Sequence, residues 1–338
     1  MTKPTTLTLS TPDDVLAAVP LLLGFHPEES LVVLTAGGPG RPFHARVDLP
    51  ESTEAMNQLV DYLTEVVLRH RVERLVLVVY SDDGVLAEDL VGALEDALYG
   101  HTQVMQAIQA DGRRWYCLAD CDRCPVGGAP YDLRSHPFTA QAVYEGQAAF
   151  ASREEVADSL VGTDPDAVEE VARAAEAAER RWRGAGRTPL GAPLPDGEAT
   201  LVAAEGRWVE QQVRAWTGSE TTPDARDAGR LLVALRRVVI CHVAWSMLTR
   251  SVASEHVDLW RDVVRRCPVE LRAAPAALLG FAAWLSGSGA LAWCAIERCQ
   301  EAEPDYPLAQ LLAEILISAR SPDTWQPPVS GMGGSCAS

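Results

Sequence analysis

A continuous apolar run, Leu75-Val76-Leu77-Val78-Val79-Tyr80, limits the folds open to this chain more than any other feature. Apolar, mostly β-branched residues without a polar interruption are typical of a strand that is buried on both faces of a sheet. The segments on either side of this run have helical periodicity instead. Apolar residues recur at helical spacing from Met56 to Val67, and residues 85–98 form a second such segment. The alternation of strand and helix predicts an α/β arrangement.

Further strands are predicted on both sides of the buried run. Residues 31–35 and 44–49 have strand composition and are joined by a short loop that contains three glycines. Two more strands, over 104–110 and 113–118, are joined by Asp111-Gly112, a strong hairpin signal. We therefore expect a mixed, partly parallel sheet that is mostly parallel at its centre and antiparallel at its edges.

Beyond residue 138 the sequence contains no further convincing strand. A capping box at Ser152-Arg153-Glu154-Glu155 opens one helix, and Asp164-Pro165 opens a longer one that ends near Arg183. The expected organisation is an α/β domain over 1–138, a helical extension over 139–183, a Gly- and Pro-rich linker over 184–197, an all-α domain over 198–320 and a disordered tail over 321–338. The helices predicted in the all-α domain span 198–216, 224–248, 255–266, 275–286, 289–302 and 306–319.

The last of these helices have a spacing that resembles a tetratricopeptide repeat, a helix-turn-helix unit of about 34 residues. The matching positions are Leu279-Gly280, Ala292, Ile296, Cys299 and Pro304. Ala276 and Ala283 stand where the repeat has aromatic residues, so the match is partial. A generic helical bundle accounts equally well for the small residues, and both interpretations stay open.

The charge of the chain excludes one class of partner. Its formal net charge is −18, whereas a protein that neutralises phosphates needs clustered Lys and Arg. We therefore expect neither a nucleic acid nor a membrane surface as a partner. One basic cluster, Arg180-Arg181-Trp182-Arg183, is present, and its favoured interpretation is a cationic last helical turn that complements the helix dipole.

The chain is expected to be cytoplasmic. Its first residues do not resemble a signal peptide, and no apolar segment reaches the roughly 18 residues needed to cross a bilayer. Four cysteines lie within helical patterns as small core residues rather than in a disulfide framework. These are Cys241, Cys267, Cys294 and Cys299.

A separate cysteine cluster has the residue types of a zinc site. Cys121 and Cys124 form a CxxC pair, and Cys117 and His136 could complete a tetrahedral ligand set. The second well-spaced pair that zinc modules usually carry is missing. A reversible disulfide and thiols that only pack the loop are therefore open alternatives to zinc.

A ligand site is most plausible at the end of the buried strand. Asp82 and Asp83 follow that strand at the edge where α/β sheets place ligands, and they have the chemistry to hold Mg²⁺ or a ribose hydroxyl. Capping the next helix needs the same residues, and this interpretation is favoured. His26 has Glu28 and Glu29 nearby and could be a general base, but no nucleophile motif accompanies it. A structural role in the turn is favoured for His26 as well.

The segment Leu23-Gly24-Phe25-His26-Pro27-Glu28-Glu29-Ser30-Leu31-Val32 resembles the signature of an actinobacterial family catalogued as domain of unknown function 4192. The resemblance extends over 115–125, 276–284, 289–292 and 303–306, and so covers most of the chain. The cysteine segment of that family usually ends in Cys-Cys-Pro, whereas Arg123 precedes Cys124-Pro125 here. The resemblance implies no activity, substrate or catalytic residue.

Two hypotheses about function follow. The first is a non-catalytic protein-interaction or regulatory factor that binds a protein partner through its helical domain, because no catalytic motif is present. The alternative is a small-ligand-binding protein or metal-dependent enzyme that uses the carboxyl edge of the sheet, with His26, Asp82 and Asp83 converging. A pocket shared by these residues and the cysteine loop would favour the alternative.

Overall fold

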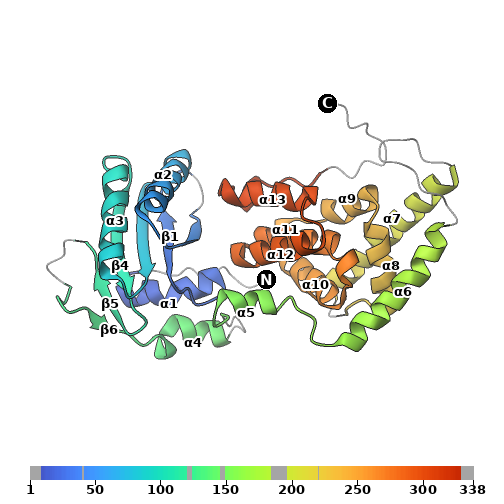
Figure 1. The fold of residues 1–338 in the computed structure, drawn as a ribbon, viewed down its shortest axis with the longest axis horizontal. Helices are drawn as coiled ribbons and strands as arrows, with labels where there is room; N and C mark the ends of the chain where they lie inside the picture. Colours follow the sequence, from blue (N-terminus) through green and yellow to red (C-terminus); the bar gives the residue numbers. More distant parts are fainter. Residues whose placement is uncertain are drawn as a thin grey trace. The chain divides into compact units, whose positions relative to one another are not determined.

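A computed structural model describes residues 9–39, 42–119, 124–144, 149–183, 196–219 and 221–328. The chain divides into two compact units, Met1–Glu155 and Val156–Ser338 (Figure 1). The first unit contains the sheet, and the described part of the second contains helices without a strand. The predicted combination of an α/β part followed by a helical part is confirmed. The predicted linker 184–197 lies outside the described residues, apart from Asp196 and Gly197 at the start of a helix.

The first unit is built on a six-stranded sheet with the strand order β2-β1-β3-β4-β5-β6. The strands are β1 (Ser30–Ala36), β2 (His44–Asp48), β3 (Arg74–Tyr80), β4 (Gln103–Ala110), β5 (Arg114–Cys117) and β6 (Ala129–Pro130). Among the described pairs, β3 and β4 are parallel and the others are antiparallel. The sheet is mixed, as predicted, but the mostly parallel centre was wrong. The hairpin strand β1 inserts between β2 and β3, which share one direction, and runs antiparallel to both.

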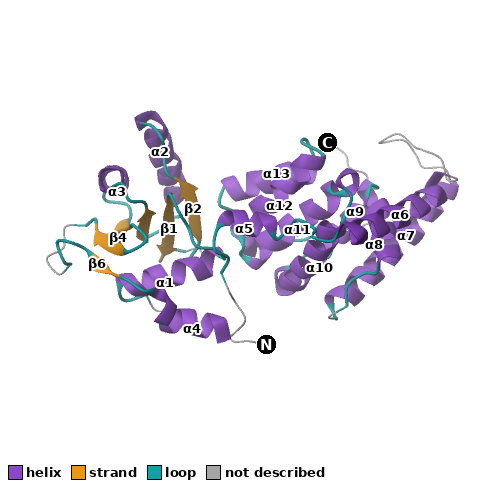
Figure 2. Ribbon diagram, turned by 60° about the horizontal axis from the view of Figure 1, so that its bottom comes forward, coloured by secondary structure: helices purple, strands orange, loops and turns teal. Residues whose placement is uncertain are grey.

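Helices cover both faces of this sheet (Figure 2). Helices α2 (Thr53–Arg69) and α3 (Gly84–Leu98) lie on one face, and α1 (Pro12–Leu23) and α4 (Pro137–Tyr144) lie on the other. Leu77 points into the core that α2 and α3 close, whereas its neighbour Val78 is fully buried on the opposite face. Each face of β3 meets a helical layer, which accounts for the unbroken apolar run that follows the exposed Arg74 at its start.

The second unit is an assembly of helices. These are α6 (Pro165–Arg183), α7 (Asp196–Thr217), α8 (Ala225–Leu235), α9 (Val238–Ser246), α10 (Ala253–Arg266), α11 (Ala273–Ser286), α12 (Gly289–Ala302) and α13 (Pro307–Ile317), while the short α5 (Arg153–Asp158) spans the boundary between the units. Helix α11 is buried on every side and pairs with α12. The assembly contains the helical hairpin that the tetratricopeptide spacing describes, and its nature as a repeat stays a prediction. None of the described helices combines the length and apolar character needed to cross a membrane.

The single helix predicted over 224–248 was wrong, because the structure divides it into α8 and α9. Arg237 takes an extended backbone conformation between them. Its guanidinium carbon lies 4.8 Å from the centre of the Trp182 ring, and Nη2 lies 3.7 Å from a carboxylate oxygen of Glu198. Contacts with two other helices thus stabilise a break at which the sequence has neither Pro nor Gly.

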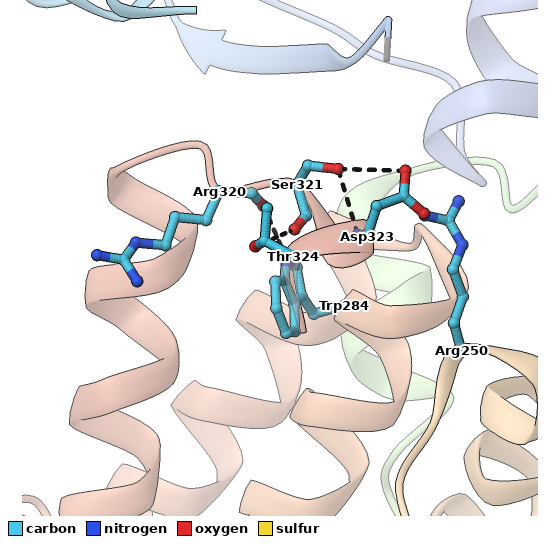
Figure 3. Close-up of polar contacts among 6 residues, drawn as sticks. All are labelled: Arg250, Trp284, Arg320, Ser321, Asp323 and Thr324. Atoms are coloured by element: carbon cyan, nitrogen blue, oxygen red, sulfur yellow. Dashed lines mark hydrogen bonds and ion pairs between the residues drawn. The ribbon is translucent and has the colours of Figure 1, made fainter. Parts of the chain in front are cut away.

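A short segment after α13 packs against the helical unit (Figure 3). Asp323, in the short helix η4 (Pro322–Thr324), forms an ion pair with Arg250. The Trp325 indole N–H donates to the carbonyl of Leu248 at 2.9 Å, and its ring contacts the rings of Trp245, Phe281 and Trp284. Residues 321–328 therefore differ from the predicted disordered tail, because Trp325 has an aromatic socket to fill. Residues 329–338 lie outside the described part.

The contact between α6 and α8 generates a first prediction, because Gly229 lets the two backbones approach. A Cβ atom at this position would lie 2.5 Å from the backbone nitrogen of Ala175. Gly229→Ala should therefore lower the free energy of unfolding by about 1–3 kcal/mol in urea titrations, despite its better helix propensity. Gly206→Ala is the matched control, since its Cβ would meet only Val243 at 3.9 Å, and it should be neutral or stabilising by up to about 1 kcal/mol. Equal effects of the two substitutions would contradict this account of the α6–α8 contact.

A buried histidine generates a second prediction. His256 on α10 is 1% exposed, and its Nδ1 atom has no hydrogen-bond partner among the described residues. Burial lowers the pKa of His256 to about 4. The unfolded chain therefore binds a proton near pH 6.5 that the folded chain accepts only near pH 4, so this group costs stability as the pH falls through that window.

The cost should reach about 3 kcal/mol at pH 4. The free energy of unfolding, measured by urea titration from pH 7 to pH 4, should fall by about that much more in the unmodified protein than in His256→Leu. Parallel pH profiles of the two proteins would rule out a buried neutral imidazole.

Candidate functional site

The turn between α1 and β1 is a structural joint. Gly24 ends α1 in a left-handed conformation, with φ of 84°, and the next residue, Phe25, forms a β-bridge with Phe150. The His26 backbone N–H donates to the Phe150 carbonyl at 3.0 Å, while the His26 side chain is exposed. His26 thus joins two segments through its backbone, and among the described residues no side chain forms a hydrogen bond or an ion pair with its ring.

Glu29 has a structural role in this turn that the sequence did not predict. Its φ of 38° is uncommon for a residue with a side chain. The Ser81 hydroxyl donates to Glu29 Oε2 at 3.0 Å, and the Leu49 N–H donates to the Glu29 carbonyl at 3.3 Å. These bonds hold the strained turn against the ends of β2 and β3.

The aspartates after β3 lie at the same edge of the sheet as this turn, because Ser30 pairs with Tyr80. The Asp83 carboxylate accepts hydrogen bonds from the N–H groups of Val85 and Leu86, both at 3.0 Å, and so caps α3. Asp82 is exposed. His26, Asp82 and Asp83 thus lie at one end of the sheet. The hydrogen bonds formed there by His26 and Asp83 involve backbone groups and have a structural role.

The predicted zinc ligands have separate roles where they are described. His136 Nε2 lies 3.2 Å from Asp14 Oδ1, and its Nδ1 accepts the Phe138 N–H at 3.2 Å, so both ring nitrogens are engaged at the α1–α4 contact. Cys117 pairs with Ile108 in the sheet. Within the described ranges, no group of three His, Cys, Asp or Glu side chains could hold a metal ion. Cys121 lies outside those ranges, so the set Cys117, Cys121, Cys124 and His136 stays a prediction.

The contact with Asp14 indicates the structural role of His136. Burial of the Asp14 carboxyl would raise its pKa, but hydrogen bonds from Ser10 and Thr11 and the adjacent His136 lower that pKa below its ordinary value. The reciprocal hydrogen bonds between Thr11 and Asp14 form the capping box of α1. The histidine therefore reinforces a helix cap.

A cleft in the second unit is a stronger candidate for a binding site. It lies between α6, α7 and α8, which run side by side in Figure 1, and encloses about 460 Å³. We call it the α6–α8 cleft. It is lined by Ala174, Ala177, Ala178, Arg181, Trp182, Glu205, Arg226, Asp227 and Arg230. Its walls thus combine methyl groups, one indole ring, guanidinium groups and carboxylates.

A buried ion-pair network forms the floor of the cleft. Glu205 on α7 is 1% exposed, and both of its carboxylate oxygens accept hydrogen bonds from Arg230 on α8, at 2.8 and 3.0 Å. Arg181 on α6 adds a third contact at 3.3 Å. The Arg230 guanidinium also lies 3.9 Å from the centre of the Trp208 ring. These contacts hold the side chains of Glu205 and Arg230 in one arrangement.

Two side chains at the cleft are less constrained. Arg226 is exposed and forms no ion pair with another described residue. Arg181 is 58% exposed in spite of its contact with Glu205. These guanidinium groups are accessible to a bound molecule.

Sequence reasoning identified only a fragment of this cleft. The cluster Arg180-Arg181-Trp182-Arg183 was noticed, and its favoured interpretation was a cationic helix end. In the structure Arg181 and Trp182 line the cleft. Glu205 and Arg230, which form the floor of the cleft, lie on other helices, and no local motif connects the three segments.

Comparisons with known proteins place the chain in a family without an assigned activity. The family model described as domain of unknown function (DUF4192) matches residues 12–323. No curated protein and no solved structure matches the chain.

The cap of α3 generates the third prediction, which separates a structural from a ligand-binding role of the aspartates. Asp83→Ala should lower the free energy of unfolding by about 1 kcal/mol, whereas Asp83→Ser, which retains a capping oxygen, should keep most of the stability. Asp82→Ala is the matched control and should change it by less than about 0.5 kcal/mol. Urea denaturation measures all three. A larger loss for Asp82→Ala than for Asp83→Ala would reject the capping role.

Proposed function

The chain belongs to the DUF4192 family, and from that premise we propose that it is a non-catalytic cytoplasmic protein that binds a protein partner through its helical unit. The α6–α8 cleft carries this proposal. It offers exposed guanidinium groups beside an apolar wall and a rigid ionic floor, which are properties of a recognition surface. Among its lining residues there is no Ser, Cys, His or Lys to act as a nucleophile or a proton shuttle.

The chemistry of the thiols also supports a binding role. Cys241, Cys267 and Cys299 are buried as free thiols, as expected for core residues in a reducing compartment. Burial raises the pKa of both Cys267 and Cys299 to about 12. These thiols are protonated at neutral pH and are poor nucleophiles.

The alternative, an enzyme or ligand-binding protein at the carboxyl edge of the sheet, has less support. The Glu29 and Asp83 carboxylates at that edge accept hydrogen bonds from the groups that hold the turn and cap α3. A catalytic site needs groups that are free to bind substrate or move a proton. The α6–α8 cleft, with its exposed guanidinium groups, meets the requirement for accessible groups better than the sheet edge does.

The fourth prediction tests the cleft directly. Ala177 is an exposed cleft residue, so Ala177→Trp should fill the cleft without disturbing the core. Partners captured from the native host by the full chain, identified by mass spectrometry and confirmed with purified components, should bind Ala177→Trp at least about 10-fold more weakly, a loss of about 1.4 kcal/mol.

Ala215→Trp provides the matched control, because Ala215 is exposed on α7 and does not line the cleft. It should retain every partner at unchanged affinity. Retention of all partners by Ala177→Trp would refute the proposal that the cleft is the binding surface.

A further inference from the structure

We infer that the α6–α8 cleft recognises an acidic peptide segment, with a Glu or Asp carboxylate of the partner held by Arg226 and Arg181. This inference rests on the proposed function and assigns a chemistry to the partner. Its starting point is a charge contrast. The whole chain carries a net charge of −18, yet the cleft is lined by three arginines and two acidic residues.

The negative charge of Glu205 is compensated within the floor of the cleft. Arg230 occupies both carboxylate oxygens through its fork of donors, and Arg181 approaches one of them as well. One carboxylate therefore faces two guanidinium groups, which leaves one positive charge uncompensated in this trio. A surplus of positive charge of this kind attracts an anion.

Arg226 and Asp227 set the amount of charge at the rim. Arg226 adds an exposed guanidinium without an ion pair among the described residues, while Asp227 adds a carboxylate to the lining. The lining as a whole has a surplus of one positive charge. A single carboxylate matches this surplus, whereas the nearly doubly charged phosphate of a phosphopeptide exceeds it.

The geometry of the donors also fits a carboxylate. Arginine presents parallel N–H groups that pair with the two oxygens of a planar carboxylate. The side chains of Arg181 and Arg226 remain accessible for this contact, because the first is 58% exposed and the second is classed as exposed. Acidic residues of the partner therefore have ready-made donors at the mouth of the cleft.

The apolar wall indicates a peptide rather than a bare anion. Ala174, Ala177 and Ala178 follow one another at helical spacing along α6, and the Trp182 ring continues this wall. Methylene groups of a Glu side chain and an adjacent small apolar residue can pack against such methyl groups. The free volume of about 460 Å³ accommodates a few side chains.

The test uses the full-length protein and a fluorescein-labelled peptide in which the unit Glu-Ala-Leu is repeated. Binding is measured by fluorescence anisotropy. The peptide should bind saturably, and Arg226→Gln should weaken binding at least about 10-fold. Arg207→Gln should leave it unchanged, since Arg207 is exposed on α7 outside the cleft. The same peptide with Gln for Glu should bind at least about 10-fold more weakly.

Three results would overturn the inference. These are equal binding of the Gln peptide, an equal effect of Arg207→Gln and Arg226→Gln, or tighter binding of a phosphoserine peptide than of the Glu peptide. Failure of the inference differs from failure of the proposed function. If Ala177→Trp abolishes capture of the natural partner while the acidic peptide does not compete for it, the cleft binds a partner of other chemistry. If Ala177→Trp leaves capture intact, the proposed function itself fails.

Discussion

The helical unit depends on a buried carboxylate that cannot remain charged alone. Glu205 is withdrawn from water, and a desolvated charge of this kind costs several kcal/mol unless it is paired and hydrogen-bonded. Its partners Arg230 and Arg181 come from two different helices. The pairing of this one charge thus ties α6, α7 and α8 together, and the absence of a side chain at Gly229 allows the close approach of α8 to α6. The cleft between these helices is a consequence of both constraints.

Much of the fold can be predicted from local sequence, because local physics decides it. The apolar run that becomes β3 has no polar position, and the structure places a helical layer on each of its faces. Strand order is different, since it depends on pairings between distant segments. The sequence of β1 contains no signal that it inserts between β2 and β3, and the expectation of a mostly parallel centre failed for that reason. The break at Arg237 likewise depends on Trp182 and Glu198, which belong to other helices.

The candidate sites likewise differ in how far the sequence could predict them. His26, Asp82 and Asp83 could be placed at one sheet edge because the ends of neighbouring strands meet there, and the register of β1 and β3 agrees. Sequence alone could not show that Glu29 and Ser81 bond to each other across that edge, since the residues lie far apart in the chain. The α6–α8 cleft was beyond prediction for a related reason. Its ionic floor joins residues from three helices, each of which looks like an ordinary amphipathic segment when it is considered alone.

The aromatic socket that holds Trp325 has a practical consequence for anyone who truncates this protein. The family match ends at residue 323, so a fragment designed on that boundary would keep the Asp323 ion pair but lose the indole two positions later. Trp245, Phe281 and Trp284 would then present ring surface to solvent. Newly uncovered aromatic surface promotes self-association. Fragments that extend to residue 328 keep this surface covered.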